Sequence, residues 1–180
     1  MRQNYEMFIE IPQGINCIYS NGTFECSKGN TKLLRNFETH NVDVEVKDGK
    51  INLRCEKANR KKIANINSYV AHIKNLFKGL SERFVYEMEI CNVHFPMTVK
   101  VDKDKLLISN FLGEKVARNA KIISGVEVKV ENNKIIISSA DVEKAGQTAA
   151  NIEKATTVTK KDRRIFQDGI FITKKPGAEI

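Results

Sequence analysis

The 180-residue sequence has no long apolar run and no obvious targeting segment. No stretch approaches the ~20 apolar residues that a membrane-spanning helix requires, so we expect no membrane partner. The first ten residues lack the continuous apolar core and the small-residue cleavage site of a secretory signal, and they are not Arg- and Ser-rich like a transit peptide. We therefore expect an intracellular protein.

The four cysteines, Cys17, Cys26, Cys55 and Cys91, are widely separated, with at least eight residues between any two. This spacing is neither that of a zinc ribbon nor that of a redox Cys-x-x-Cys pair. Cys91 and His94 have ligand-like spacing, but a structural zinc site needs four ligands. We expect four reduced thiols that pack as small hydrophobic side chains, and no metal ion.

Motifs for enzymatic chemistry are missing as well. The sequence has no phosphate-binding P-loop and no glycine pattern of a dinucleotide site. A hydrolase using Cys91 and His94 is the enzymatic alternative, but nothing else marks that pair. The carboxylates mostly alternate with basic residues, which is typical of a solvated strand face rather than of a general acid–base pair. We predict that the chain is not an enzyme, has no catalytic residue and needs no cofactor.

The sequence does contain an internal repeat. Residues 42–53 and 126–137 match at five apolar positions with a constant offset of 84 residues. In both segments apolar and polar residues alternate up to a turn, Asp48-Gly49 or Asn132-Asn133, and this period of two predicts a β-hairpin with one buried face. Upstream, Arg35-Asn36 and Arg118-Asn119 stand at places that also match, at an offset of 83.

An amphipathic helix is expected after each hairpin, because apolar residues recur there at spacings of three and four. Gly79 is a candidate C-cap of the first helix, and Asp141 is a candidate N-cap of the second. The second helix is rich in alanine and should approach its sheet more closely. The two apolar stripes are Ile63, Ile66, Val70, Ile73, Phe77 and Leu80, and Val142, Ala145, Ala149, Ile152 and Thr156.

These patterns predict an α+β fold of two tandem, duplicated modules, residues 1–82 and 83–180, each a small, mostly antiparallel sheet with one packed helix. No linker rich in Gly, Ser or Pro separates them, so they should join through the stretch from Gly79 to Arg83. Further strands are expected at Tyr5 to Ile11, Asn16 to Tyr19, Thr23 to Ser27, Arg83 to Ile90, Met97 to Val101 and Lys105 to Ser109.

The formal net charge of +8 favours a polyanionic partner, either nucleic acid or an anionic membrane surface, and of these two we expect nucleic acid. One basic cluster lies at the junction of the first hairpin and its helix. Cations oppose the helix macrodipole there, which favours an external anion, although a solvated helix start is an equal alternative. The members of this cluster are Arg54, Lys57, Arg60, Lys61 and Lys62.

A second basic stretch spans residues 160–175, where six cations interleave with Phe166 and Phe171. Arginine pairs with phosphate in a forked geometry and stacks on bases. The aromatic rings suit unpaired bases, or they anchor the segment to the sheet. For this stretch we predict nucleic-acid binding.

Several segments resemble one known family. Ala155-Thr156-Thr157-Val158, followed by Asp162-Arg163-Arg164-Ile165-Phe166-Gln167-Asp168-Gly169-Ile170, is similar to its Asp-x-Arg-x-Phe-x-Asp-Gly-Ile tail. Asn110-Phe111-Leu112-Gly113-Glu114-Lys115, His94-Phe95-Pro96 and Phe84-x-Tyr86-x-Met88 resemble its other motifs. The family is the sixth universal large-subunit ribosomal protein in its archaeal and eukaryotic form (numbered nine in the older eukaryotic scheme). The resemblance covers essentially the whole chain.

The resemblance implies a structural protein of the cytosolic large ribosomal subunit. It implies binding to large-subunit rRNA near the stalk base, the sarcin-ricin loop and the translation-factor site, beside neighbouring ribosomal proteins and with translation factors nearby. A free RNA-binding regulator is the alternative. By position, the resemblance implies that rRNA is bound by Lys115, Arg118, Asn119, Lys160, Lys161, Arg163, Arg164, Lys174 and Lys175.

Two segments depart from the family pattern. The segment after Lys115, residues 116–121, is less cationic than its counterpart in the family, and Gln3 to Lys32 matches weakly. Because of these departures, we expect the C-terminal stretch to make a larger share of the rRNA contacts.

Overall fold

The computed structural model describes residues 3–37, 42–47 and 49–179, and the chain divides into two compact units, Met1–Glu82 and Arg83–Ile180. Each unit combines antiparallel sheets with one long helix, which confirms the predicted α+β class. The described strands of each unit are divided between two sheets. His40, Asp48 and the other residues outside these ranges lie outside the description.

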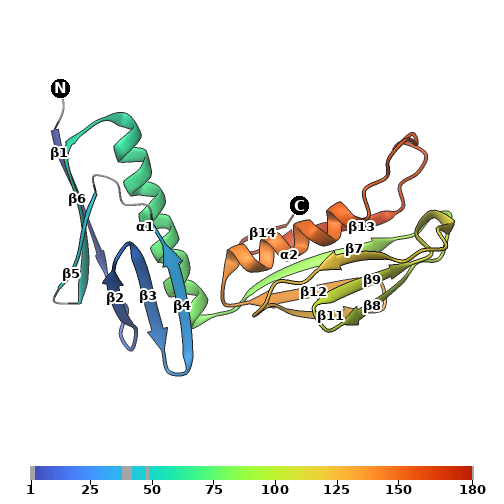
Figure 1. Ribbon diagram of the computed structural model, residues 1–180, viewed down its shortest axis with the longest axis horizontal. Helices are drawn as coiled ribbons and strands as arrows, with labels where there is room; N and C mark the ends of the chain where they lie inside the picture. The colour runs from blue at the N-terminus through green and yellow to red at the C-terminus, as the bar shows by residue number, and fades with distance from the viewer. Residues whose placement is uncertain (1–2, 38–41, 48, 180) are drawn as a thin grey trace. The chain divides into compact units, whose positions relative to one another are not determined.

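Unit 1 has two three-stranded sheets, in the orders β1-β6-β5 and β2-β3-β4. The helix α1 contacts strands of both sheets, so a single core forms between helix and strands (Figure 1). The elements are β1 (Gln3–Glu10), β2 (Asn16–Ser20), β3 (Thr23–Lys28), β4 (Thr31–Asn36), β5 (Asp43–Lys47), β6 (Lys50–Ala58) and α1 (Arg60–Ser81).

Unit 2 repeats this plan and adds two strands. Its sheets have the orders β11-β12-β7-β13-β14 and β10-β9-β8, so β13 lies beside β7, the counterpart of β1. The elements are β7 (Phe84–Cys91), β8 (Thr98–Asp102), β9 (Lys105–Ser109), a 3-10 turn η1 (Phe111–Gly113), β10 (Arg118–Lys121), β11 (Glu127–Glu131), β12 (Lys134–Ser139), α2 (Val142–Ala155), β13 (Gly169–Lys175) and β14 (Ala178–Glu179).

The predicted repeat is confirmed at the hairpins. Val46 pairs with Ile51 across β5 and β6, and Val130 pairs with Ile135 across β11 and β12. Ile51 and Ile135 are both fully buried, as the alternation predicts.

The upstream match of Arg35 with Arg118 is wrong. The equivalent backbone bonds run from the Phe37 N–H to the Gly22 carbonyl and from the Ile122 N–H to the Asp104 carbonyl, at 2.7 and 2.9 Å. These bonds span 15 and 18 positions of the chain, so the connection in unit 2 is three residues longer. Arg35 is therefore equivalent to the buried Ala120, and the longer connection contains η1.

Helix α1 begins at Asn59, whose side-chain oxygen accepts a hydrogen bond from the Lys62 N–H at 2.9 Å. Most of its predicted stripe is buried, although Ile63 is only half-buried. The C-cap prediction for Gly79 is wrong. Leu80 continues the buried stripe past the glycine, and the helix ends where the extended Glu82 donates its N–H to the Lys78 carbonyl.

Helix α2 confirms its predicted N-cap, because the Asp141 carboxylate accepts the Glu143 N–H at 2.9 Å. Ala145, Ala149 and Ile152 are fully buried, and the helix contacts β10 of the smaller sheet as well as β7, β12 and β13 of the larger one. Thr156 lies one residue past the helix, as its C-cap. The small side chains of Ala145 and Ala149 let the helix lie close to the strands that it contacts.

Ile152 tests how far unit 2 depends on this packing. Ile152→Ala should lower the free energy of unfolding by about 2–5 kcal/mol, because a fully buried side chain leaves a cavity. The matched control, Ile165→Ala, removes the same atoms from a side chain that is 61% exposed, and should change it by less than about 0.5 kcal/mol. Urea titration measures both; equal effects would contradict this account of the core.

Candidate nucleic-acid interface

The segment that joins α2 to β13, residues 157–168, is named here the tail loop, and it extends beyond the end of the helix (Figure 1). Its tip is a tight turn built on Asp162. The Asp162 carbonyl accepts the N–H groups of Ile165 and Phe166, at 3.1 and 2.9 Å, and its carboxylate accepts the Arg164 N–H at 2.9 Å. An aspartate that bonds the backbone two residues on is a common turn former.

Asp168 fixes the base of the tail loop to the segment after β7. Its carboxylate, in a residue only 1% exposed, accepts three hydrogen bonds, from the Val93 N–H at 2.7 Å, the His94 N–H at 2.9 Å and the His94 ring Nδ1 at 2.7 Å. We call this arrangement the Asp168 clamp. Burial alone would raise the pKa of the Asp168 carboxyl, but the bonds from His94 and Val93 outweigh it, and the pKa lies below its usual value.

Phe166 contacts the Asp168 clamp through the ring of His94. The His94 ring stacks on Phe166 with a centroid separation of 5.0 Å, and the Lys161 Nζ lies 4.4 Å from the Phe166 ring centroid. Because the ring already has these two partners, its place supports the anchoring alternative over stacking on a base. A cation held over an aromatic face is a favourable contact, and it positions Lys161 on the loop.

The last two residues of the motif, Gly169 and Ile170, are the first two residues of β13. A Cβ at Gly169 would come within 2.9 Å of the Phe171 ring, so glycine leaves room for that ring. The Ile170 N–H donates to the Thr156 hydroxyl at 2.9 Å, and Ile170 is fully buried. The family-like residues from Asp162 to Ile170 thus shape and anchor the loop.

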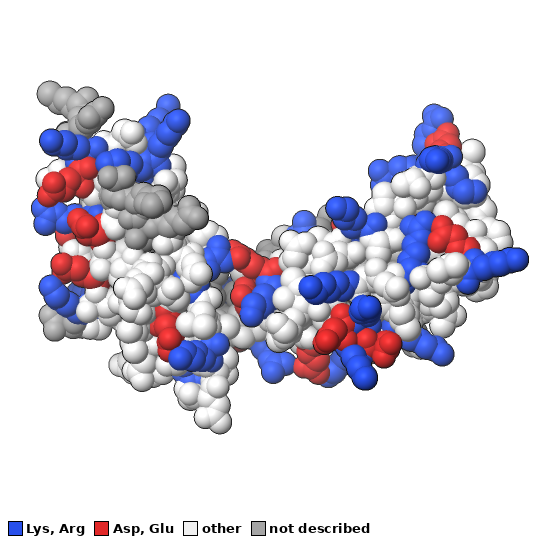
Figure 2. Space-filling view, in the orientation of Figure 1, with Lys and Arg blue, Asp and Glu red and all other residues white. Residues whose placement is uncertain are grey.

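The tail loop presents four predicted cations to solvent. Lys160, Lys161 and Arg163 are exposed, and Arg163 has no hydrogen bond or ion pair to another described residue. Arg164 pairs with Asp162 at 2.7 Å, which lowers the pKa of Asp162, but the Arg164 side chain is still 90% exposed. Figure 2 shows these basic side chains gathered on the projecting loop.

Arg118 has a different role, because its guanidinium is used inside unit 2. It forms two bonds to the Glu114 carboxylate, at 2.8 and 2.6 Å, and donates to the Ala155 and Thr157 carbonyls at 2.9 and 3.3 Å. It also lies over the Phe111 ring, 4.2 Å from the centroid. Arg118 therefore ties the loop after η1 to the start of the tail loop.

The remaining predicted residues fall into two places. Lys115 is exposed in the loop after η1, and Asn119 is exposed on β10. Lys174 and Lys175 lie near the C-terminal end of β13, where the Lys174 Nζ is 3.4 Å from the Glu87 Oε1. The tail loop joins the other end of this strand, where Gly169 pairs with Cys91. The structure does not bring these two lysines together with the tail-loop cations.

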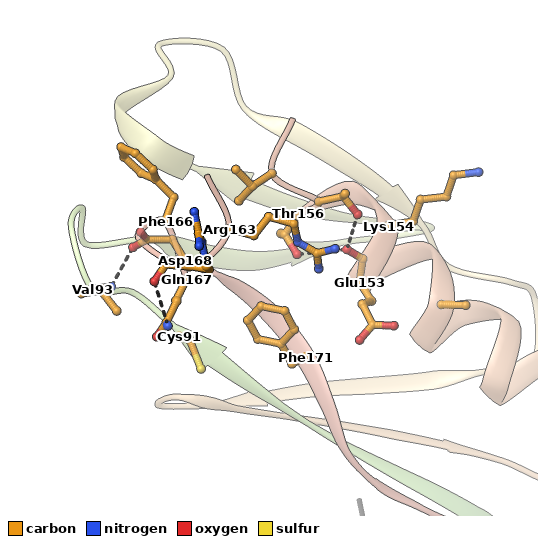
Figure 3. Close-up of a pocket in the computed structure, with 14 residues that line it drawn as sticks. Cys91, Val93, Glu153, Lys154, Thr156, Arg163, Phe166, Gln167, Asp168 and Phe171 are labelled. Atoms are coloured by element: carbon orange, nitrogen blue, oxygen red, sulfur yellow. Dashed lines mark hydrogen bonds between the residues drawn. The ribbon is translucent and has the colours of Figure 1, made fainter. Parts of the chain in front are cut away.

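A groove of about 1140 Å³ lies between the tail loop, the last turns of α2 and the start of β13. Figure 3 shows Phe171 beside Glu153 and near the loop residues Arg163 and Gln167. Phe171 is 38% exposed. Sequence reasoning grouped Phe171 with the basic stretch but missed Glu153 and Lys154, since nothing in the helical pattern marks residues that line a groove.

No hydrogen bond joins the Cys91 thiol to the His94 ring, the pair behind the enzymatic alternative. His94 bonds to Asp168, and burial and then the charges of Glu89 and Asp168 raise the pKa of the Cys91 thiol. Among residues 3–37, 42–47 and 49–179, no three His, Cys, Asp or Glu side chains are grouped as metal ligands. Within the same ranges, no helix has the length and hydropathy to cross a membrane.

The fold and the basic loop define a class, a protein of two α+β units with an exposed cationic loop suited to a polyanionic partner. The family described as Ribosomal protein L6 matches residues 95–169. Large ribosomal subunit protein uL6 from Methanocella arvoryzae is 40% identical over 168 residues, 93% of this chain and 95% of its own. The uL6 protein from Methanosarcina mazei is 41% identical over 167 residues, with the same two coverages. The chain belongs to the uL6 family of ribosomal proteins.

Membership in this family confirms the resemblance seen in the sequence. It makes the chain a structural protein of the large ribosomal subunit that functions in translation on the cytoplasmic ribosome, and not an enzyme. The hydrolase alternative is therefore dropped.

The Asp168 clamp predicts a pH-dependent stability. The pKa of Asp168 in the folded protein lies below its value in the unfolded chain, which is ~3.9. The carboxylate therefore adds to the free energy of unfolding above pH ~3.9, and this contribution is lost as the pH falls through the folded-state pKa. Asp168→Asn should cost about 1–3 kcal/mol at pH 7 and progressively less below pH ~4. Urea titrations from pH 7 to pH 3 measure this. Asp102→Asn, at an exposed position, is the control, and a cost independent of pH would contradict the assignment.

Arg118 and Lys115 should separate stability from surface charge. Arg118→Ala should lower the free energy of unfolding by about 1–3 kcal/mol, because it removes the partner of two backbone carbonyls and of Glu114. Lys115→Ala removes the same charge from an exposed position and should change stability by less than about 0.5 kcal/mol. If the two variants melt alike, the bonds of Arg118 do not stabilise unit 2.

Proposed function

We propose that this chain binds large-subunit rRNA mainly through the tail loop and the neighbouring loop that carries Lys115. The observation that carries the proposal is the set of exposed cations on a loop whose base is fixed by a buried carboxylate. Cations on a mobile loop would lose entropy on binding RNA, and the bonds of Asp168 and Asp162 would reduce that loss by holding the loop in shape beforehand.

Lys160, Lys161, Arg163 and Arg164 would contact phosphates and so fix the position and orientation of the protein on the RNA. Contacts of this kind position a protein without reading the sequence of the RNA. Arg163 is the strongest candidate for a forked phosphate contact, because Arg164 already shares its guanidinium with Asp162. Arg118 supports this surface from beneath by holding the start of the tail loop.

The groove beside the loop would accept an unpaired base. Phe171 supplies a partly exposed aromatic ring, Gln167 and Glu153 supply polar groups, and Arg163 lies at the rim. Single-stranded RNA is commonly held by aromatic stacking together with nearby cations. Lys174 and Lys175, at the far end of β13, would contact a separate stretch of RNA.

On the subunit, we propose a position near the stalk base, the sarcin-ricin loop and the translation-factor site, next to other large-subunit proteins. The likeness of the 84–170 motifs to those of the family supports this placement. Ultraviolet crosslinking of intact subunits, followed by sequencing of the linked RNA and peptide, tests it. Tail-loop peptides linked to that rRNA region are expected; links to another region would contradict the placement.

The proposed phosphate binding predicts a change in salt dependence. Replacing Lys160 and Arg163 by Ala should weaken binding to large-subunit rRNA about tenfold or more. The plot of log affinity against log salt has a negative slope, and the magnitude of this slope should decrease by about 0.7–0.9 for each phosphate that is no longer neutralised by a side chain. Filter binding between 50 and 300 mM salt measures both quantities.

The matched control removes the same charge elsewhere. Lys103→Ala with Lys144→Ala should weaken binding less, because both residues are exposed and neither belongs to the proposed surface. If both double variants weaken binding equally, binding follows net charge alone and the proposed surface is wrong.

Sedimentation of lysate through a sucrose gradient distinguishes a ribosomal protein from the alternative, a free RNA-binding regulator. A protein that stays at the top of the gradient would be a free RNA-binding regulator.

A further inference from the structure

Two of the four cysteines face each other across neighbouring strands of unit 1. Cys17 on β2 is the direct cross-strand partner of Cys26 on β3, and their sulfur atoms are 3.0 Å apart. Cys17 is half-buried and Cys26 is fully buried. Both thiols are free. The pair plays no part in the RNA surface proposed above, which is in unit 2.

The register of the hairpin favours a bond between these two sulfurs. The strands join through the two-residue turn Asn21-Gly22, with φ of 48° and 77°, which the closing pair of Ser20 and Thr23 brackets. Counting alternate pairs from that hydrogen-bonded closing pair makes Cys17 and Cys26 a non-hydrogen-bonded pair. In such pairs the Cα atoms are about 4.5 Å apart, which falls within the ~4.4–6.8 Å range of disulfides.

Two thiols alone do not make a structural zinc site, which takes four ligands. Among the described residues, no third His, Cys, Asp or Glu side chain joins the pair as a ligand. Closing from 3.0 Å to the ~2.05 Å of a disulfide needs only a small movement of two side chains.

The two thiols differ in a way that assigns their roles. The hydrogen bond from Cys26 lowers the pKa of the Cys17 thiol, against the effect of burial, and the same bond with burial raises the pKa of Cys26. Cys17 is therefore the better thiolate, and it is also the more accessible of the two. Cys26 holds the proton and lies in position to attack a modified Cys17.

We propose that Cys17 and Cys26 are an oxidation site that forms a reversible disulfide on reaction with a peroxide. The Cys17 thiolate attacks one peroxide oxygen, the O–O bond breaks, and protonation of the departing oxygen gives water and a sulfenic acid on Cys17. The Cys26 sulfur then attacks the Cys17 sulfur, the S–O bond breaks, and the Cys26 proton leaves with the oxygen as a second water. Two thiols are oxidised and one peroxide is reduced to two waters.

The test uses the full chain treated with hydrogen peroxide, quenched with N-ethylmaleimide and mapped by mass spectrometry. A Cys17–Cys26 disulfide is expected, seen as linked peptides ~2 Da lighter than their reduced, unalkylated forms and reversed by dithiothreitol, with Cys55 and Cys91 alkylated once the quenched protein is unfolded. The linked peptide should form at least about tenfold faster in native protein than in urea, because the fold holds the sulfurs together. A matching rate in urea, or no linked peptide, would overturn the proposal.

Single variants separate this pair from general thiol oxidation. Cys26→Ser should stop at a dimedone-reactive sulfenic acid on Cys17, and Cys17→Ser should form no intramolecular disulfide. Cys55→Ser, which changes a buried thiol of the same unit, should form the Cys17–Cys26 bond as the parent does. Circular dichroism confirms that each variant is folded before oxidation. An intramolecular disulfide in folded Cys17→Ser would assign the reaction to other cysteines and refute the proposal.

Discussion

The buried carboxylate of Asp168 is the contact on which the candidate RNA surface depends. It lies at the end of the tail loop and bonds two consecutive backbone N–H groups and one ring nitrogen on the segment after β7. Because those donors belong to residues 74 and 75 positions away in the chain, one side chain joins two loops that would otherwise move independently. The His94 ring stacks on Phe166, and Lys161 lies over the Phe166 ring, so the position of this loop cation depends on the clamp.

The candidate surface lies in the parts of unit 2 that the described residues of unit 1 lack. Both have the same strand order around one helix, but unit 2 differs at three described places, namely β13 beside β7, the longer connection between β9 and β10, and the tail loop. Arg118 joins two of these places by bonding Glu114 on one side and the Ala155 and Thr157 carbonyls on the other. The groove and the tail-loop cations therefore lie where the second copy departs from the first. Each unit thus has its own core of the same plan, and the added segments carry the proposed binding surface.

Much of the fold was predictable because one-sided burial leaves a periodic pattern. The hairpins around residues 48 and 132 follow from alternation, and the helices from stripes such as Ile66, Val70 and Ile73. The failures have physical causes as well. β4 and β10 were missed because their sequences, Thr31–Asn36 and Arg118–Lys121, are short and largely polar. Gly79 misled because burial of Leu80 outweighed the usual preference of glycine for a helix end.

The candidate site was predictable only in part. The basic stretch and the family-like motif marked the tail loop, and exposure of Lys160, Lys161 and Arg163 agrees with that expectation. Charge alone did not distinguish Arg118, which binds inside the unit, from Lys115, which faces solvent. The bond between His94 and Asp168 joins two motifs that were seen separately, and no single sequence states which residues meet in space.

The most direct test of the account is the affinity of Asp168→Ala for large-subunit rRNA at fixed salt. The substitution removes a negative charge, so electrostatic attraction alone predicts binding equal to or tighter than that of the parent. The account predicts the opposite, an affinity about tenfold weaker, because the cations are no longer held in place before binding. Affinity equal to or above that of the parent, in a variant shown to be folded, would contradict the claim that the clamp organises the RNA surface.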